Sequence, residues 1–296
     1  MGRTRYGQNF LNDAGFLAPM LQAADLRAAD LAIEVGPGRG ILTQELCRQA
    51  GFVVAIEVDR SLAERLPARI GGPGNLTVVA RDALTCDFAE IIGSGRKAWT
   101  AGMGPSVRSD LAPVKVVANL PFYATAPLLQ RFQDSRALFE RLVLMVQAEV
   151  GERILAAPGE SAYGALSPLL AYDFEIRWLG RIPSKAFDPA PKVDAASLLL
   201  IPRKTPPADA GSRDDLSFTV HAAFGMRRKT LREALGRALE ASAGSRKAGR
   251  ALAEAWLEEA GVEPSRRGET LSLQEYASLS RRLPEVRARE HSSAPG

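Results

Sequence analysis

The sequence Leu31-Ala-Ile-Glu-Val-Gly-Pro-Gly-Arg-Gly40 joins a short apolar run directly to a glycine-rich loop. The next residues, Ile41–Gln49, have the apolar spacing of a helix, so a strand, a loop and a helix are expected here. Two more short apolar runs, Phe52–Val58 and Leu76–Ala80, follow with a helical segment between them. Short strands that alternate with helices of ordinary length predict a doubly wound, mostly parallel α/β sheet.

The alternation continues toward the C-terminus, with one interruption at Gly93–Pro113. This segment holds several glycines and prolines and is predicted to be a long surface loop. Phe174–Leu179 and Ala195–Ile201 are expected to be strands joined without a helix, which favours an antiparallel hairpin at the sheet edge. The other expected elements are strands at 114–119 and 142–147 and helices at 15–29, 61–70 (with Ser61 as N-cap), 125–133, 149–156 and 163–172.

The last third of the chain differs, because only helical periodicity is found after residue 215. Residues 206–215 have the composition of a linker, and Gly261 is expected to end a helix. The predicted fold class is therefore a Rossmann-like α/β sheet followed by a small all-α domain, with helices at 216–226, 229–241, 246–260 and 272–283. We expect a catalytic domain at 1–204, a linker at 205–215, a helical domain at 216–284 and a flexible tail at 285–296.

The composition is that of an ordinary soluble globular protein, with 46% apolar and 24% charged residues in a chain of 296. No apolar run approaches the ~20 residues of a membrane span, and the N-terminus lacks the apolar core of a signal peptide. The two cysteines, Cys47 and Cys86, belong to no motif that predicts a disulfide framework or a zinc site. These features favour a cytoplasmic protein without a membrane partner or a metal.

The net charge of +4 is distributed unevenly along the chain. Residues 203–296 hold 17 Lys and Arg against 13 Asp and Glu, whereas residues 1–202 hold 21 of each. A basic helical domain beside a neutral one points to a polyanionic partner, although the same charge also serves solubility.

Carboxylates follow the glycine loop at the ends of the next two expected strands. Glu57 lies 21 residues after Gly36, and Asp82 lies just beyond the third strand. A carboxylate at the first position accepts hydrogen bonds from both ribose hydroxyls of a nucleoside, and one at the second accepts from an adenine amino group. Pro37 between the glycines and the lack of a second nucleotide-binding half favour S-adenosylmethionine, a nucleoside without phosphate, over a pyrophosphate ligand. The alternative is a glycine turn with a purely structural role.

The motif Asn119-Leu120-Pro121-Phe122 ends another expected strand, Val114–Asn119. Open α/β sheets bind their ligands at the carboxyl ends of strands. Pro121 stiffens the backbone, and the Asn119 amide, a carbonyl and an aromatic ring together suit a flat base that carries an amino group. Taken alone, such a motif is more often an ordinary strand end that turns into a loop.

With these motifs in this order, nearly the whole chain resembles the ribosomal RNA adenine dimethyltransferases of the KsgA type, which are related to the erythromycin-resistance methyltransferases. The resemblance implies a class I methyltransferase sheet and a helical RNA-binding domain. The segments that carry it are GQNFLND (Gly7–Asp13), EVGPGRGILT (Glu34–Thr43), IEVDR (Ile56–Arg60), RDAL (Arg81–Leu84), NLPFYATAPLL (Asn119–Leu129), QAEVGERILAAPGESAYGALS (Gln147–Ser167), IPSKAFDPAPKVDAA (Ile182–Ala196), FGMRRKTLREAL (Phe224–Leu235) and GVEPSRRGETLSLQEY (Gly261–Tyr276).

The resemblance also implies a role for each matching residue. The Asn119 side chain and the Leu120 carbonyl, followed by Pro121, would accept hydrogen bonds from the N6 amino group of a target adenine. Phe122 would stack on that base, and Phe187 would form a second aromatic wall. The cofactor S-adenosylmethionine would be bound by Asn9, Leu11, Gly36, Gly38, Glu57, Asp82, Ala83 and Asn119.

Basic residues of the helical domain would contact RNA phosphates, which gives binding that weakens with salt. The first cluster is Arg227-Arg228-Lys229, and a solvated helix face is its simpler explanation. The expected 93–113 loop is either an insertion without function or a supplementary RNA contact. The chain departs from the family pattern where Phe122 and Tyr123 replace the usual Tyr and Asn. Further basic residues are Arg232, Arg246, Lys247, Arg250, Arg266 and Arg267 in the helical domain and Arg96, Lys97 and Arg108 in the loop.

We therefore interpret the chain as an enzyme, an S-adenosylmethionine-dependent rRNA (adenine-N6,N6)-dimethyltransferase. The resemblance implies that the substrate is two adjacent adenines in a hairpin loop near the 3′ end of small-subunit (16S) rRNA. It also implies a monomeric enzyme that acts on a pre-30S particle during ribosome biogenesis. Two alternatives stay open: a macrolide-resistance-type methyltransferase that acts on a large-subunit (23S) rRNA adenine, and a ribosome-assembly factor that binds RNA without turnover.

Overall fold

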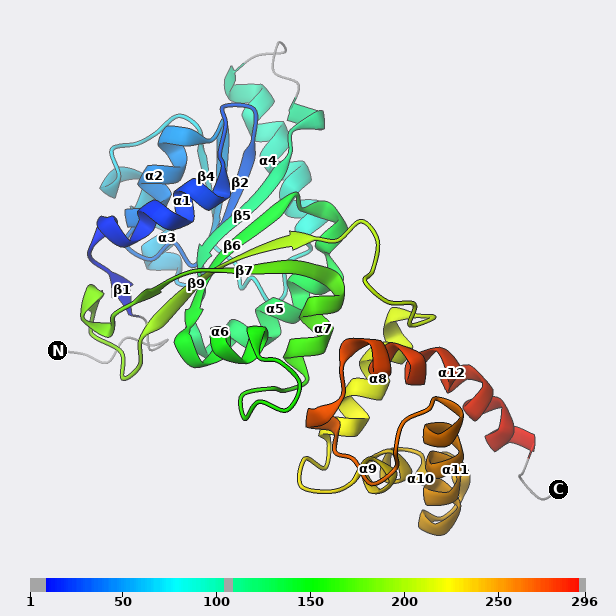
Figure 1. Ribbon diagram of the computed structural model, residues 1–296. Helices are drawn as coiled ribbons and strands as arrows, with labels where there is room; N and C mark the ends of the chain where they lie inside the picture. Colours follow the sequence, from blue (N-terminus) through cyan, green and yellow to red (C-terminus); the bar gives the residue numbers. More distant parts are fainter. Residues whose placement is uncertain (1–8, 104–108, 293–296) are drawn as a thin grey trace. The chain divides into compact units, whose positions relative to one another are not determined.

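The computed structural model describes residues 9–103 and 109–292 of the chain (Figure 1). The chain divides into two compact units. The first contains residues up to 151 and residues 174–202, and the second contains residues 152–173 and those from 203 onward. None of the described helices is both long and apolar enough to cross a bilayer.

Seven strands form the central sheet of the first unit, in the order β4-β3-β2-β5-β6-β9-β7. The five strands from β4 to β6 in this order are parallel, and β9 is antiparallel to both β6 and β7. The predicted fold class is thus confirmed, including the antiparallel hairpin at the sheet edge. The strands are β2 Leu31–Val35, β3 Phe52–Ile56, β4 Leu76–Val79, β5 Val114–Asn119, β6 Arg141–Gln147, β7 Phe174–Ile182 and β9 Ala195–Pro202.

Helices cover both faces of this sheet, which is why its central strands are mostly apolar. Every residue of β2 and β3 is buried. Figure 1 shows α1, α2 and α3 on one side of the sheet and α4 on the other. The helices of this unit are α1 Ala18–Ala24 (after a 3₁₀ turn at Ala14–Leu17), α2 Ile41–Gln49, α3 Arg60–Arg69, α4 Phe88–Met103 and α5 Thr125–Asp134. The boundary between the units falls within α6 Ala148–Leu155.

The prediction of a long surface loop at Gly93–Pro113 is wrong, because α4 runs through Met103 and a 3₁₀ turn follows at Ser109–Leu111. Parallel strands need a crossover connection, and α4 provides it between β4 and β5. Gly95 of this helix is buried against the sheet. A Cβ at this position would lie 2.6 Å from the Val54 Cγ2 atom, so the glycine lets the helix approach the sheet closely.

The sequence proposed an RNA contact through three basic residues of that segment, and the structure describes two of them. The Arg96 guanidinium donates a hydrogen bond to the Ala112 carbonyl at 2.9 Å, so it ties α4 to the chain that leads into β5. Lys97 lies on α4, and Arg108 lies outside the described residues. The described part of this segment therefore has a role in the fold, and Lys97 is exposed on α4.

Two helix ends differ from the sequence-based expectation. α1 ends at Ala24, earlier than predicted, because Asp25 adopts a left-handed conformation with φ of 47°. The N-cap of α3 is Asp59 and not Ser61, since the Asp59 carboxylate accepts hydrogen bonds from the Ser61 and Leu62 amides at 2.9 and 3.2 Å. The cap is thus a carboxylate two residues before the expected hydroxyl, and Ser61 lies inside the helix.

The second unit is helical and has its own apolar core, in which Trp256 and Tyr276 are fully buried. Gly261 follows α11 with φ of +72°, as expected for a residue that ends a helix. The helices are α7 Leu166–Asp173, α8 Arg213–Phe224, α9 Leu231–Ala238, α10 Glu240–Ala243, α11 Arg246–Glu259 and α12 Leu273–Ser292, with a 3₁₀ turn at Gly268–Thr270.

Two sequence-based boundaries differ from this division. Residues 152–173 were assigned to the catalytic domain, but Tyr163 and Tyr172 pack into the core of the helical unit. The Tyr163 hydroxyl also donates to the Leu271 carbonyl at 2.9 Å. The tail expected from residue 285 is helical as far as Ser292, because α12 continues past Pro284 and Val286 is buried. Residues 293–296 lie outside the described part.

Candidate active site

One pocket of the first unit lies at the carboxyl edge of the sheet, where the sequence placed its motifs. The strand order brings the ends of β4, β3, β2 and β5 together, so Asp82, Glu57, Gly36 and Asn119 follow one another in space. β5 is thus the direct neighbour of β2, although two strands separate them in the sequence. All the residues that were predicted to bind the cofactor line this pocket: Asn9, Leu11, Gly36, Gly38, Glu57, Asp82, Ala83 and Asn119.

The glycine loop connects β2 to α2 and depends on left-handed backbone conformations at Gly36 (φ +74°) and Gly38 (φ +55°). A Cβ on Gly36 would lie 3.6 Å from the Asn119 carbonyl oxygen and 3.7 Å from the Pro121 Cδ atom. The loop therefore passes closely beside the end of β5. A side chain at Gly36 would occupy space between the two motifs.

Glu57 is only 2% exposed, and both oxygens of its carboxylate are held by backbone amides. Oε2 accepts from the Gly38 amide at 3.1 Å and Oε1 accepts from the Asp59 amide at 3.0 Å. Burial raises the pKa of this carboxyl, and the two amides oppose that shift by favouring the charged form. Each carboxylate oxygen has further acceptor capacity, so Glu57 can both brace the glycine loop and accept from a ligand.

Asp82 lies in a turn beyond β4 that its own side chain stabilises. Its Oδ1 atom accepts from the Leu84 amide at 2.9 Å, and its carbonyl accepts from the Thr85 amide at 3.0 Å. Asp82 is exposed, whereas Ala83 next to it is 7% exposed. The turn thus places one carboxylate and one small apolar side chain on the pocket wall.

Asn119 is the last residue of β5, and the chain after it is well fixed. The Leu120 amide donates to the Met145 carbonyl at 3.0 Å, and the Ala124 amide donates to the Pro121 carbonyl at 2.9 Å. Residues 122–124 form a 3₁₀ turn that leads into α5. This rigid turn presents the side chains at positions 119 and 122 to the pocket, with Tyr123, 60% exposed, beside them.

Glu34 lines the same pocket, although the sequence had not assigned it a role. It is 1% exposed, and its Oε2 atom has no hydrogen-bond partner among the described residues. Burial raises its pKa to about 8, the Glu57 charge adds to the shift and the Thr43 hydroxyl opposes it. A buried polar atom without a partner points to a water or a ligand group. Its signal in the sequence is a carboxylate inside a buried strand, two residues before the glycine loop.

The short strand β1 (Phe10–Leu11) forms a two-stranded ribbon with β8 (Phe187–Asp188), which pairs Leu11 with Phe187. Neighbouring residues of a strand point to opposite faces, so Asp188 is exposed while Phe187 is buried in the core around Leu11. Phe187 is 4% exposed and is not among the residues that line the pocket. The sequence predicted that Phe187 forms a second aromatic wall of the site, whereas the structure places this side chain in the core.

The comparison with known families agrees with this geometry. A sequence model of the family described as "Ribosomal RNA adenine dimethylase" matches residues 1–277. The chain belongs to the ribosomal RNA adenine dimethylase family. Members of this family are methyltransferases, so the predictions of an enzyme and of its class are confirmed.

Individual relatives match this adenine dimethylase over nearly its full length. It is 43% identical to the ribosomal RNA small subunit methyltransferase A of Moorella thermoacetica over 95% of this chain and 92% of the relative. It is 39% identical to the protein of the same name from Geobacter sulfurreducens, over 95% of each chain. The interpretation drawn from the sequence motifs is thus confirmed at the level of the family.

Two crystal structures share the fold of this dimethylase. A dimethyladenosine transferase from Plasmodium falciparum has a TM-score of 0.73 at 24% identity, over 94% of this chain and 98% of that one. The 23S rRNA methyltransferase ErmE has a TM-score of 0.64 at 24% identity, over 93% and 100%. Because identity is low in both cases, these likenesses support the fold only.

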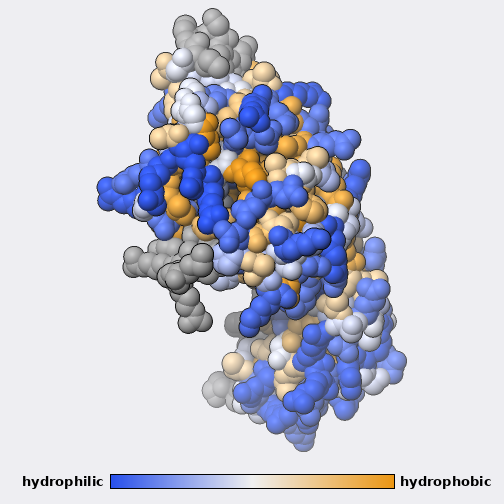
Figure 2. All heavy atoms as spheres, turned by 90° about the vertical axis from the view of Figure 1, so that its left-hand side faces the viewer, coloured by the Kyte–Doolittle hydropathy of each residue, from blue (hydrophilic) through white to orange (hydrophobic). Residues whose placement is uncertain are grey.

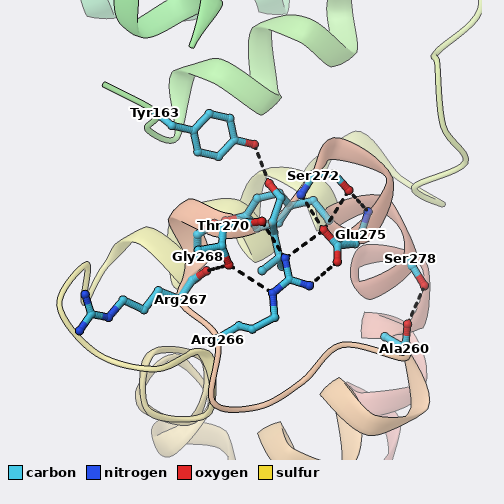
Figure 3. A network of polar contacts seen from close by, with 11 residues as sticks. Tyr163, Ala260, Arg266, Arg267, Gly268, Thr270, Ser272, Glu275 and Ser278 are labelled. Atoms are coloured by element: carbon cyan, nitrogen blue, oxygen red, sulfur yellow. Dashed lines mark hydrogen bonds and ion pairs between the residues drawn. The ribbon is translucent and has the colours of Figure 1, made fainter. Parts of the chain in front are cut away.

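The basic residues of the helical unit of this dimethylase divide into two groups. Several are engaged in ion pairs within the unit: Arg246 and Arg250 with Glu233, Arg232 with Glu254, and Arg227 with Glu269. Arg228 and Lys229 are exposed in the turn between α8 and α9. Figure 3 shows the same contrast within one pair, since Arg266 points into a network with Thr270 and Glu275 while Arg267 points away from it.

Proposed function

We propose that this protein transfers methyl groups from S-adenosylmethionine to N6 of two adjacent adenines in a hairpin loop of small-subunit rRNA. The proposed loop lies near the 3′ end of that RNA, and the substrate is a pre-30S particle in the cytoplasm. The observation that carries the proposal is the row of Asp82, Glu57, Gly36 and Asn119 around one pocket. The names of the relatives, small-subunit rRNA methyltransferases, support the choice of RNA.

The residues around the pocket fit S-adenosylmethionine. The Glu57 carboxylate would accept hydrogen bonds from the two ribose hydroxyls, and Asp82 would accept from the adenine amino group. The left-handed backbone at Gly36 leaves room for the methionine portion, because the position lacks a Cβ. The unpartnered oxygen of Glu34 is an acceptor suited to an ammonium group.

Asn119 and Leu120 would act on the target adenine. The lone pair of adenine N6 is delocalised into the ring, so this nitrogen is a weak nucleophile. The Asn119 side-chain oxygen and the Leu120 carbonyl, by accepting from its two hydrogens, would favour a pyramidal nitrogen and aim its lone pair. S-adenosylmethionine supplies an electrophilic methyl group with a neutral leaving group. Alignment by the two acceptors therefore provides much of the catalysis, and the proton leaves to solvent after transfer.

The target base has to leave its stack to enter the pocket, which favours a single-stranded loop. Phe122 at the pocket would stack on the base, and aromatic stacking contributes ~1–3 kcal/mol per base. The exposed residues Arg228, Lys229 and Arg267 would neutralise phosphates of the surrounding RNA without reading its sequence. The same three residues make the binding of RNA weaken as salt rises.

The test is methyl transfer to ribosomal particles that lack these modifications. Purified protein is incubated with radiolabelled S-adenosylmethionine and either small or large subunits, and the methylated adenines are mapped by mass spectrometry. We expect dimethyladenine at two adjacent positions of the small-subunit RNA. Dimethyladenine only in large-subunit RNA would favour a resistance-type enzyme, as in the fold neighbour ErmE. Binding to small subunits without any transfer would favour an assembly factor.

A further inference from the structure

The β1–β8 ribbon packs directly on the glycine loop. A Cβ on Gly38 would lie 2.9 Å from two carbon atoms of the Phe10 ring, so the ring fits only over a glycine. Phe10, together with Asn9 and Leu11, lines the pocket. The ribbon carries β1 across the loop that is proposed to hold the cofactor. Figure 2 views this side of the molecule, where apolar side chains are exposed among hydrophilic ones.

Arg39, from the glycine loop itself, contacts both strands of this ribbon. Its guanidinium lies 4.5 Å from the centroid of the Phe10 ring, within the range of a cation–π interaction. Its Nη1 atom also lies 2.9 Å from the Asp188 Oδ2 atom. β1 pairs Phe10 with Asp188, so the one guanidinium bridges a cross-strand pair. Three segments that are distant in the sequence therefore meet at Arg39.

The ribbon needs such an anchor because it is only two residues long in each strand. An isolated two-stranded ribbon is marginally stable even when it is longer. An exposed ion pair by itself contributes little. Here both the ion pair with Asp188 and the contact with the Phe10 ring form only when the ribbon lies against the glycine loop. Their effects therefore combine to hold Phe10 over Gly38.

We propose that the Arg39–Asp188 pair is a latch that keeps β1 closed over the nucleoside pocket, and that Arg39 is a positioning residue for retention of the cofactor. When the latch opens, Asn9, Phe10 and Leu11 leave the pocket wall together, because they belong to one strand and its approach. The latch also ties β8 to the glycine loop. The proposal rests on the proposed function in one respect, that the ligand of the pocket is S-adenosylmethionine.

The primary test measures binding of S-adenosylmethionine to the purified full chain by calorimetry at two salt concentrations. Arg39→Ala removes both contacts and should weaken binding ~10-fold, whereas Asp188→Asn removes only the charge and should weaken it ~3-fold. The double variant should bind like Arg39→Ala, because the Asp188 contribution acts through Arg39. The difference in affinity for S-adenosylmethionine between the wild type and Arg39→Ala should be smaller at the higher salt concentration.

Arg48→Ala is the matched control, since Arg48 forms an exposed ion pair with Glu45 on α2 and does not touch the ribbon. It should bind the cofactor like the wild type. Hydrogen exchange without cofactor gives a readout that does not depend on the ligand. Amides of residues 9–17 should exchange faster in Arg39→Ala than in wild type or Arg48→Ala.

The outcomes separate the latch from the proposed function. Wild-type affinity in both Arg39→Ala and Asp188→Asn would overturn the latch, as would additive losses in the double variant or unchanged exchange at residues 9–17. A wild-type chain that does not bind S-adenosylmethionine would overturn the proposed function, and with it the role of Arg39 in cofactor retention. Faster exchange in Arg39→Ala would then still show that the pair closes the ribbon.

Discussion

The Glu57 carboxylate and the Gly38 amide are 19 residues apart in the chain and 3.1 Å apart in the structure. This hydrogen bond joins the end of β3 to the loop that follows β2. It gives Glu57 two tasks, because the same carboxylate braces the loop and remains able to accept from a ligand. The two tasks can be separated by substitution.

Glu57→Ala should weaken binding of S-adenosylmethionine at least ~10-fold, since hydrogen bonds to a charged group contribute ~1.5–3 kcal/mol each. Glu57→Gln should weaken it less, because the amide oxygen can still accept from Gly38. Calorimetry with the purified variants measures both values, and Glu45→Ala on α2 serves as a control. Unchanged affinity in Glu57→Ala, with transfer lost, would contradict the assigned role.

Asn119→Ala should abolish methyl transfer while cofactor binding stays nearly intact. Removal of a hydrogen-bonding group that acts in the transition state typically costs a factor of ~10²–10³ in kcat. Single-turnover transfer to undermethylated small subunits measures the rate, and calorimetry measures the affinity for the cofactor. The assignment fails if the main defect of Asn119→Ala is loss of cofactor affinity.

Glu34 should make the stability of the cofactor-free protein depend on pH. Its pKa in the folded state is about 8, compared with 4.5 for a free carboxyl, so the folded protein keeps a proton that the unfolded chain loses. The free energy of unfolding therefore falls as pH rises from about 4.5 to about 8, and the loss is complete above that range. The Glu34→Gln variant should not show this fall in the free energy of unfolding, because glutamine does not titrate.

Thermal unfolding of the wild type and Glu34→Gln at pH 5 and pH 9 measures the difference. The melting temperature of the variant, relative to wild type, should be higher at pH 9 than at pH 5 by about 2 °C or more. All other titrating groups are shared, so their effects cancel in this comparison. The same change in melting temperature between pH 5 and pH 9 in both proteins would show that the pKa of Glu34 is not raised.

Substitution of Arg266 should lower the stability of the protein, whereas substitution of Arg267 should weaken RNA binding. The Arg266 guanidinium donates to the Thr270 carbonyl at 2.7 Å and pairs with Glu275 (Figure 3). The Glu275 carboxylate raises the pKa of Arg266. Arg266→Ala should therefore lower the free energy of unfolding by ~1–3 kcal/mol. Arg267→Ala should leave the melting temperature unchanged, weaken RNA binding, and reduce the slope of log affinity against log salt by ~1.

Filter binding to the rRNA hairpin at several salt concentrations, together with thermal melts, compares the two variants. Each is the control for the other, because the residues are adjacent and carry the same charge. A loss of RNA affinity in Arg266→Ala without any change in melting temperature would reverse the assignment.

The elements that the sequence predicted best are those whose pattern has a local cause. The bounds of β2 and α2 agree with the prediction, because an apolar run, a glycine loop and a helical spacing follow one another there. α4 was missed because its glycines resemble those of a loop. Gly95 is in fact required by contact with Val54, a residue of another element. No pattern within residues 93–113 reveals that contact.

The sequence by itself determined the order of the central-sheet strands along the chain, most of the helices, the family, and which residues lie at strand ends, since these depend on spacing along the chain. Only the tertiary structure decided which strand ends are neighbours, and so placed Gly36 beside Asn119. It also decided that Phe187 is buried, that Arg266 is engaged while Arg267 is exposed, and that Arg39 meets Asp188 across 149 residues. The physical reason is that contacts between distant segments depend on strand order and packing, which a local pattern does not encode.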